Sequence, residues 1–349
     1  SYEARGLYTF NNESYNGNTG SSLRSAPNPD LGWEKSYKTN IGLDITIAKR
    51  INISVDFYQN IIDDAINSIT IPAENGFNAV LANMAKMRNR GWDANIQAQI
   101  LSGSFSWNSS LNLGANRSTI LEVKNGFERF SSTTNATVLR TGISITAIWG
   151  FLFAGVDPQT GLEQYYDDGK VVSVTDLNRS ITNGVYLGDR LPKVQGGWVN
   201  NFSYKGFTLT VNIIYNFGAK FLIDNNLENN GRNLQNSNMS VNLLDRWQKP
   251  GDITNVPKLR LSANPLVPAS SKYVYSNDFI KLSNLSLAYQ IPAKWLKAAK
   301  STRIAVFANV TNLFYWYADG TPEGRNGIKE YKFRFPEAQT WTGGIKCNF

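Results

Sequence analysis

The sequence predicts an all-β fold, a transmembrane antiparallel β-barrel, and three observations lead to this prediction. Apolar and polar residues alternate with a period of two along about nine segments, each of which can form a strand. Short and long connections between these segments alternate along the chain. No run of about eighteen apolar residues occurs, so the sequence contains no candidate transmembrane helix.

The bulk composition agrees with a barrel, although it is close to that of a soluble protein. The chain has 349 residues, of which 12% are aromatic and 18% are charged, and its mean hydropathy is -0.32. In a barrel only every second residue of a strand meets lipid, so the hydropathy averages to soluble-looking values. One barrel can also take up this length without a domain break.

The residue types present exclude several kinds of site. There is no histidine and Cys347 is the only cysteine, so Ser-His-Asp and Cys-His catalytic groups, histidine metal sites and disulfides are unavailable. Asp56, Asp167 and Asp168 form no convincing glycosidase pair. The net charge is +8, but the 35 Lys and Arg residues are scattered, which argues against nucleic-acid binding. We therefore expect no catalytic residue, no metal and no cofactor.

The clearest element is a hairpin within residues 188–218. Its second strand has apolar or aromatic residues at six consecutive alternate positions, separated mainly by Thr and Asn: Phe207, Leu209, Val211, Ile213, Tyr215 and Phe217. About eleven residues at roughly 3.4 Å each, tilted near 45°, rise by ~26 Å, which matches the apolar band of a membrane barrel. The turn Lys205-Gly206 joins this strand to residues 194–204, where Trp198, Phe202 and Tyr204 share one face.

Four strands are predicted before this hairpin. Residues 33–47 and 51–60 are joined by a tight turn at 48–50, and residues 92–100 and 104–116 are joined through Ser102-Gly103. Each has one apolar face, and the opposite face of the fourth is almost entirely amide and hydroxyl. The apolar positions include Ile41, Leu43, Ile45 and Ile47, then Ile51, Ile53, Val55 and Phe57, then Trp92, Ile96, Trp107, Leu111 and Leu113.

Three strands are predicted after the hairpin, at residues 279–291, 303–312 and 341–349. The outer face of the first is clear only in its second half, from Leu285 to Ile291. In the second, Ile304 and Val306 compete with Phe307 for the outer face, which leaves its orientation open. Residues 292–300 read as a compact, helical turn between these two strands.

Five long connections are expected on one side of the sheet, at about residues 1–32, 62–87, 117–191, 219–277 and 313–331. The short connections follow Ile47, Ile100, Tyr204 and Ile291 and lie on the other side, which in an outer-membrane barrel is periplasmic. Within the third long connection, residues 165–172 predict a small hairpin with an Asp-Gly turn. Such strict segregation of loops is not expected of a soluble sandwich or propeller.

Nine strands are too few for a closed bacterial barrel, and an odd number is unusual. An open sheet would leave unpaired edges in lipid. The sequence also opens at Ser1 without an initiator Met or a leader. We therefore expect the chain to be the C-terminal part of a barrel whose N-terminal part is missing.

Several motifs, taken in order, resemble the SusC-like or RagA-like family of TonB-linked outer-membrane transporters. They cover nearly the whole chain: residues 28–35 (NPDLGWEK), 88–92 (RNRGW), 154–161 (AGVDPQTG), 188–193 (GDRLPK), 244–252 (LDRWQKPGD), 279–287 (FIKLSNLSL) and 309–314 (NVTNLF). The family more often has an acidic residue or Lys near the position of Arg90.

This resemblance implies a 22-stranded barrel in the outer membrane of a Gram-negative bacterium, of which this chain is the C-terminal part. It further implies TonB-dependent import of a nutrient, oligosaccharide or peptide, together with a SusD-like surface lipoprotein. The plug domain and the TonB box are absent from this chain, so contact with TonB would come from the missing N-terminal part. The remaining partners are the rest of the same barrel and outer-membrane lipid.

Two alternatives stay open at this point. One is a barrel of the same family that acts as a scaffold in a secretion or assembly complex. The other is a soluble all-β binding module or hydrolase, which would have to place Leu209, Val211 and Ile213 in a water-soluble core.

The candidate substrate-binding residues are aromatic side chains of the long connections, because aromatics suit oligosaccharides and peptides: Trp149, Tyr165, Tyr166, Tyr315 and Trp316, with Phe151, Phe153 and Tyr317 nearby. The alternative for all of them is packing within loops or in the aromatic girdle at the membrane interface. Phe349, a C-terminal aromatic after alternating apolar positions, is the candidate membrane-assembly signal; alternatively it packs at the barrel seam.

Overall fold

The structure is a computed structural model of the whole chain. It describes residues 2–5, 8–15, 18–23, 26–71, 74, 76–77, 79–126, 128–130, 136–223, 241–259, 268–292, 303–318 and 338–348. Phe349 and the helical turn expected over 293–300 lie outside the described residues. In the part that is described, no helix is long and apolar enough to cross a membrane.

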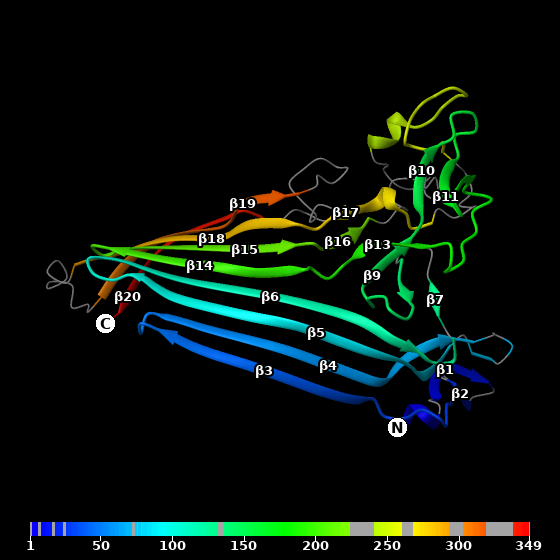
Figure 1. The fold of residues 1–349 in the computed structure, drawn as a ribbon, viewed down its shortest axis with the longest axis horizontal. Coiled ribbons are helices and arrows are strands. Elements are labelled where there is room, and N and C mark those ends of the chain that lie inside the picture. Colours follow the sequence, from blue (N-terminus) through cyan, green and yellow to red (C-terminus); the bar gives the residue numbers. More distant parts are fainter. Residues whose placement is uncertain are drawn as a thin grey trace.

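One curved antiparallel sheet of nine strands dominates the fold (Figure 1). Each strand pairs with the next along the chain, so the sheet is a meander and the predicted strands are confirmed. The strands are β3 (Lys35–Ile47), β4 (Ile51–Thr70), β5 (Ala79–Leu101), β6 (Phe105–Val123), β14 (Val194–Tyr204), β15 (Phe207–Phe217), β18 (Phe279–Gln290), β19 (Arg303–Tyr317) and β20 (Thr340–Asn348).

The tight turns all lie at one end of this sheet, on the left in Figure 1, and the long connections lie at the other end. Turn residues at this end have positive φ: Ala48 and Lys49 between β3 and β4, and Lys205 and Gly206 between β14 and β15. Such turns match the right-handed twist of antiparallel strands. The segment containing Trp149 lies at the opposite end from Lys205, as a barrel requires.

The two faces of the sheet have the chemistry that the alternation predicted. Cross-strand partners place Ile213 opposite Trp198, Leu209 opposite Phe202 and Val211 opposite Leu285, all on one face. Large hydrophobic residues of this face remain exposed, which suits contact with lipid rather than a soluble core; they include Ile41, Leu43, Ile45, Phe57, Trp198, Phe207, Leu287, Val306, Phe314 and Ile345. We call this the lipid face, and the other the luminal face.

The register of β19 against β18 assigns the orientation that the sequence left open. The pairing of β18 with β19 shifts between Leu282 and Asn284, and Asn312 of β19 has a φ of 59°. Below the bulge Val306 pairs with Tyr289, and above it Phe314 pairs with Leu282, so both lie on the lipid face. Phe307 is luminal, and its ring lies against Gly344 of β20.

Two of the predicted long connections are corrected by the structure. Residues 62–87 are mostly strand, because β4 continues to Thr70 and β5 begins at Ala79. Alternation fails there because the register shifts between Ile62 and Ile66 and between Lys86 and Met87. Ala65, Ala85 and Ile120 also form a core with Leu139 from the loop above. Residues 1–32 contain the hairpin of β1 (Tyr8–Tyr15) and β2 (Asn18–Leu23).

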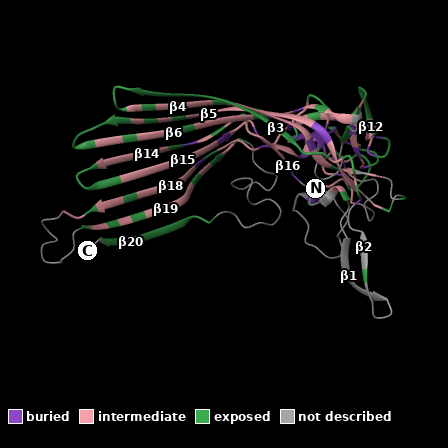
Figure 2. Cartoon of the chain, turned by 90° about the horizontal axis from the view of Figure 1, so that it is seen from below, coloured by how far each residue is buried: buried purple, intermediate pink, exposed green. Residues whose placement is uncertain are grey.

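The described parts of the connections 117–191 and 219–277 form small sheets at the long-loop end, where the buried residues concentrate (Figure 2). The predicted Asp-Gly hairpin is confirmed, since Asp167 pairs with Lys170 across a turn in which Asp168 and Gly169 have positive φ. The elements are β7 (Arg129–Phe130) with β8 (Val138–Leu139), β9 (Ala147–Gly150) with β13 (Val185–Asp189), β10 (Leu152–Val156) with β11 (Glu163–Asp167) and β12 (Lys170–Ser173), and β16 (Lys220–Leu222) with β17 (Val274–Ser276).

Short 3-10 helices complete the described elements: η1 (Tyr2–Arg5), η3 (Lys124–Gly126), η5 (Val241–Asp245) and η6 (Ser271–Tyr273). Together the small sheets and helices form a cap over one end of the wall. The cap has its own apolar cores, of which one contains Phe151 and Tyr165 and another contains Ile148 and Ala269.

Candidate functional site: the luminal wall beneath the cap

The luminal face is a surface of amides and hydroxyls. Because side chains alternate along every strand, the residues between the lipid-facing positions all project to this side. Such groups donate and accept hydrogen bonds without carrying charge, which suits water and hydrophilic cargo. The row includes Asn52, Ser54, Asn95, Gln97, Ser106, Asn108, Ser110, Asn112, Gln195, Asn201, Thr208, Thr210 and Asn212.

A pocket of about 780 Å³ lies where this wall meets the cap. The wall contributes carboxylates and amides, and the segment that leads from β13 into β14 contributes Arg190 and Pro192. The lining from the wall includes Ser54, Asp56, Asp93, Asn95, Asn112, Gln195 and Asn216. The pocket is therefore polar and carries charges of both signs.

Main-chain oxygens of β9 hold Arg190 in place. Its guanidinium donates to the carbonyl oxygens of Thr146 and Ala147 at 3.3 Å and 3.2 Å. Asp189 accepts hydrogen bonds from the Thr146 hydroxyl and the Leu191 amide. Burial lowers the pKa of Arg190 while Asp189 opposes the shift, and a guanidinium stays charged throughout the physiological range. The cap thus presents a fixed cation.

Two carboxylates face this cation from the wall. Asp56 and Asp93 are direct cross-strand partners on the luminal face of β4 and β5. Like charges directly opposite each other destabilise a sheet. Asp56 accepts a 3.3 Å hydrogen bond from the Asn40 amide, and among the described residues no cation forms an ion pair with either carboxylate. This part of the wall therefore favours positively charged groups in the lumen.

The register separates two of the predicted substrate residues. Tyr315 pairs with Lys281 and Trp316 with Ile280, so Tyr315 is luminal whereas Trp316 is on the lipid face, where it is 46% exposed. The Lys281 ammonium lies 4.9 Å from the centre of the Tyr315 ring, and Tyr317 stacks on Tyr315 at 5.9 Å. Of these three residues, Tyr315 and Tyr317 are on the luminal face.

Two other predicted substrate residues lie inside the cap. Trp149 is only 6% exposed; it packs with Val138, and the Arg140 guanidinium lies 5.4 Å from its ring. Tyr165 is fully buried in the core that contains Phe151. Both form packing contacts within the cap, and their contact with substrate stays a prediction. Tyr166, the next residue of β11, is 49% exposed.

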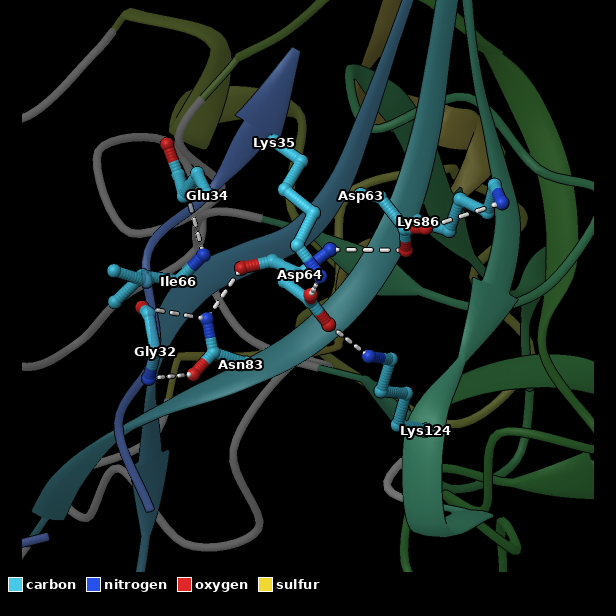
Figure 3. Close-up of polar contacts among 9 residues, drawn as sticks. All are labelled: Gly32, Glu34, Lys35, Asp63, Asp64, Ile66, Asn83, Lys86 and Lys124. Atoms are coloured by element: carbon cyan, nitrogen blue, oxygen red, sulfur yellow. Dashed lines mark hydrogen bonds and ion pairs between the residues drawn. The ribbon is translucent and has the colours of Figure 1, made fainter. Parts of the chain in front are cut away.

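A polar clamp at the long-loop end was not anticipated from the sequence (Figure 3). Asp64, at a bulge with a φ of 59°, forms ion pairs with Lys35 at 3.1 Å and with Lys124. Asn83 donates to the Asp64 carbonyl oxygen and accepts from the Gly32 amide. The hydrogen bonds from Lys124 and Lys35 hold the pKa of the Asp64 carboxyl below its usual value.

This clamp ties the start of β3 to the β4–β5 extension. A neighbouring ion pair of 3.3 Å joins Asp63 to Lys86, and the Ile66 amide donates to the Glu34 carboxylate at 2.6 Å. Asp63, Asp64, Ile66 and Lys86 fall in the segment expected to be a loop, so no register could be assigned to them from the sequence.

Two motifs distant in the sequence dock together in the cap. The Trp247 ring lies against Gly161, and its indole donates a 2.8 Å hydrogen bond to the Pro158 carbonyl oxygen. The Gly251 amide donates to the same oxygen at 2.8 Å. Residues 154–161 and 244–252 are therefore structural partners.

Among the described residues no group of three or more His, Cys, Asp or Glu side chains could hold a metal ion. The candidate site is the polar pocket at which the luminal wall meets the cap.

A nine-stranded meander with a lipid face, a luminal face and loops segregated by length is the wall of an outer-membrane β-barrel. The family follows from comparison with known proteins: the chain belongs to the TonB dependent receptor-like beta-barrel family, whose model matches residues 2–313.

Individual relatives agree with this assignment. TonB-dependent receptor P39 of Formosa agariphila is 29% identical over 362 residues, which cover 88% of this chain and 34% of the relative. TonB-dependent receptor SusC of Bacteroides thetaiotaomicron is 24% identical, with 98% of this chain and 35% of SusC covered. The chain thus spans about a third of the length of these curated relatives.

The fold is similar to that of a solved transporter. A chain in the structure of the RagAB peptide transporter superimposes with a TM-score of 0.81 at 25% identity, over 99% of this chain and 38% of that chain. The resemblance to SusC and RagA inferred from the motifs is confirmed, and the protein is placed in the outer membrane.

Proposed function

We propose that this chain forms part of the barrel wall of a TonB-dependent importer that brings hydrophilic nutrients across the outer membrane. The observation that carries the proposal is the polar luminal wall, which meets the cap at a pocket containing Asp56, Asp93 and Arg190. Cargo would pass along this wall by binding and release. No bond-breaking chemistry is required of it.

The other parts of the proposed importer belong to the remainder of the same barrel. Within the described sheet, β3 and β20 each have one strand partner. A strand edge without a partner is not tolerated in hydrocarbon, so further strands would pair with both. We place the plug, the TonB contact and the closure into a barrel of about 22 strands in that remainder, following the family resemblance.

A surface lipoprotein of the SusD type is the proposed partner at the long-loop end. The cap there is a folded layer with its own apolar cores, which gives a partner a defined surface to sit on. This part of the proposal also rests on the resemblance to SusC and to the RagAB transporter.

The cargo is proposed to be a peptide or an oligosaccharide. Amides and hydroxyls along the wall suit both classes. The carboxylate pair and Arg190 favour peptides with charged groups, because each end of a zwitterion finds an opposite charge in the pocket. Among the relatives, RagAB is a peptide transporter.

Uptake by the full-length protein in a Gram-negative host tests the proposal. Fluorescently labelled peptides and oligosaccharides are supplied to cells with and without a functional TonB system. We expect accumulation of at least one cargo class that disappears without TonB. If the barrel assembles at the surface but neither class accumulates, the scaffold alternative is favoured.

A further inference from the structure

We propose that Arg88, Arg90 and Arg117 bind the phosphate groups of an anionic glycolipid of the outer leaflet, on the outside of the barrel. Arg90 lies on the opposite face of β5 from Asp93 of the luminal pocket. The proposed site concerns the membrane around the protein and does not depend on the cargo.

The three arginines lie on the lipid face directly above its apolar belt. Arg90 of β5 and Arg117 of β6 are direct cross-strand partners, and Arg88 is opposite Thr119. The same face carries Ile96, Ala94 and Trp92 in the residues below. Along β5, Arg90 is about eleven residues from the tight-turn end, or ~26 Å across the membrane at the usual rise and tilt. That height is the level of the outer-leaflet headgroups.

The charge of this cluster is not neutralised within the described part of the chain. Two cations directly opposite each other on one face of a sheet repel. No carboxylate among the described residues forms an ion pair with Arg88, Arg90 or Arg117, and the buried Arg88 Nε has no hydrogen-bond partner. A phosphate can accept from two guanidinium groups at once, so it would remove the repulsion and fill the vacant donors.

The surroundings of the pair favour a lipid as the source of that phosphate. A hollow of about 1000 Å³ adjoins the two arginines, and its lining includes the lipid-face residues Ile41, Phe57 and Trp92 and also the luminal residues Tyr58 and Asn116. Tyr186 and Asp189 from the cap also line it. The Asp189 carboxylate is engaged by Thr146 and by the Leu191 amide. The arginines can bind an anionic headgroup, and the apolar and aromatic side chains beside them can contact acyl chains, so the two together suit a lipid.

The test measures lipid bound to the full-length protein purified from outer membranes in mild detergent. Native mass spectrometry quantifies the phosphorylated glycolipid that remains on the wild type, on the double variant Arg90→Gln/Arg117→Gln, and on the control Lys49→Gln/Arg50→Gln. The control removes the same charge from the tight-turn end. We expect at least fivefold lower occupancy in the arginine variant and unchanged occupancy in the control. Equal occupancy in all three would overturn the proposal.

A second measurement uses the wild type alone, so it remains decisive if the arginine variant fails to assemble. The delipidated protein is mixed with lipid A that carries its phosphates and with lipid A from which they have been removed. We expect at least tenfold weaker binding of the dephosphorylated lipid. Equal binding would overturn the proposal, and so would displacement of the phosphorylated lipid by an equimolar amount of inorganic phosphate, which would indicate a site for free phosphate.

Discussion

The indole Nε1 of Trp107 donates a 2.9 Å hydrogen bond to the side-chain oxygen of Asn200 on the lipid face. Asn200 is only 4% exposed and lies opposite Ser109, which accepts a 2.8 Å hydrogen bond from the Trp198 indole. Polar groups in hydrocarbon are costly unless they are paired. Two tryptophans therefore satisfy the two polar side chains that interrupt the apolar belt.

The first prediction follows from this arrangement. Trp107→Phe leaves the Asn200 oxygen without its donor and should destabilise the full-length barrel by about 1 to 3 kcal/mol. Asn200→Leu in the Trp107→Phe background should restore most of that loss, because no buried polar group is then left unpaired. Denaturant unfolding in detergent, analysed as a double-mutant cycle, measures both effects. Additive losses in the double variant would show that the hydrogen bond is unimportant.

Neighbouring residues of β15 should respond in opposite ways to a positive charge. Ile213 lies on the lipid face opposite Trp198, while Asn212 is luminal. Ile213→Arg should destabilise assembly by about 2 to 4 kcal/mol if the position is at mid-bilayer, and Asn212→Arg should be far better tolerated. Folding yield of the complete barrel, followed by its heat-dependent migration in gels, provides the readout. Comparable yields for the two variants would count against the face assignment.

The Asp64 clamp should loosen in acid. The folded-state pKa of Asp64 lies below its ordinary value because Lys124 and Lys35 donate to its carboxylate. The stabilisation is therefore fully present above the unfolded pKa of about 3.9 and is lost as the pH falls through the lower folded value. We expect hydrogen exchange of the Ile66 amide and its neighbours to increase over that interval.

The variant Asp64→Asn should abolish this acid dependence while keeping the bulge, since Asn tolerates positive φ. Asp168→Asn, also at positive φ but in an exposed turn, is the matched control and should behave as the wild type does. An unchanged acid response in Asp64→Asn would assign the effect to another group.

Docking of the two cap motifs depends on the absence of a side chain at Gly161. Its φ is +68°, and an added Cβ would lie 2.4 Å from the Trp247 ring. Gly169 has a similar φ of +75° but open space around it. Both Gly→Ala changes incur backbone strain of about 1 to 2 kcal/mol, but only Gly161→Ala should also displace residues 244–252. Limited proteolysis should cleave that segment faster in Gly161→Ala alone; equal cleavage in both variants would argue against the docking.

The alternation in the sequence was sufficient for the nine strands, their order and the faces of most of them. It left β19 open because a large aromatic, Phe307, lies on the luminal face beside lipid-facing Val306; the bulge at Asn312 shifts the pattern only beyond the predicted strand. The Phe307 ring packs against Gly344 of the next strand. Neither the bulge nor this contact is visible within the strand's own sequence.

The site was predicted less well than the fold. The aromatics of the long connections were recognisable, but their exposure depends on partners distant in the chain. Trp149 lies against Gly184, and Tyr165 packs with Val174 and Leu177. The alternation of side chains along each strand was enough to place Asp56 and Asp93 on the luminal face. That they lie directly opposite each other became known only from the register of β4 with β5.

Site-directed spin labelling along residues 208–216 of β15 measures which face of the wall meets lipid and which meets water. Labels are introduced one at a time into the full-length protein in lipid bilayers, with Cys347 replaced by Ser, and their collision rates with oxygen and with a water-soluble nickel complex are compared. The account predicts strict alternation, with Leu209, Val211, Ile213 and Tyr215 accessible to oxygen and the residues between them accessible to nickel. Loss of the alternation, or its reversal, would contradict a wall with lipid on one side and water on the other.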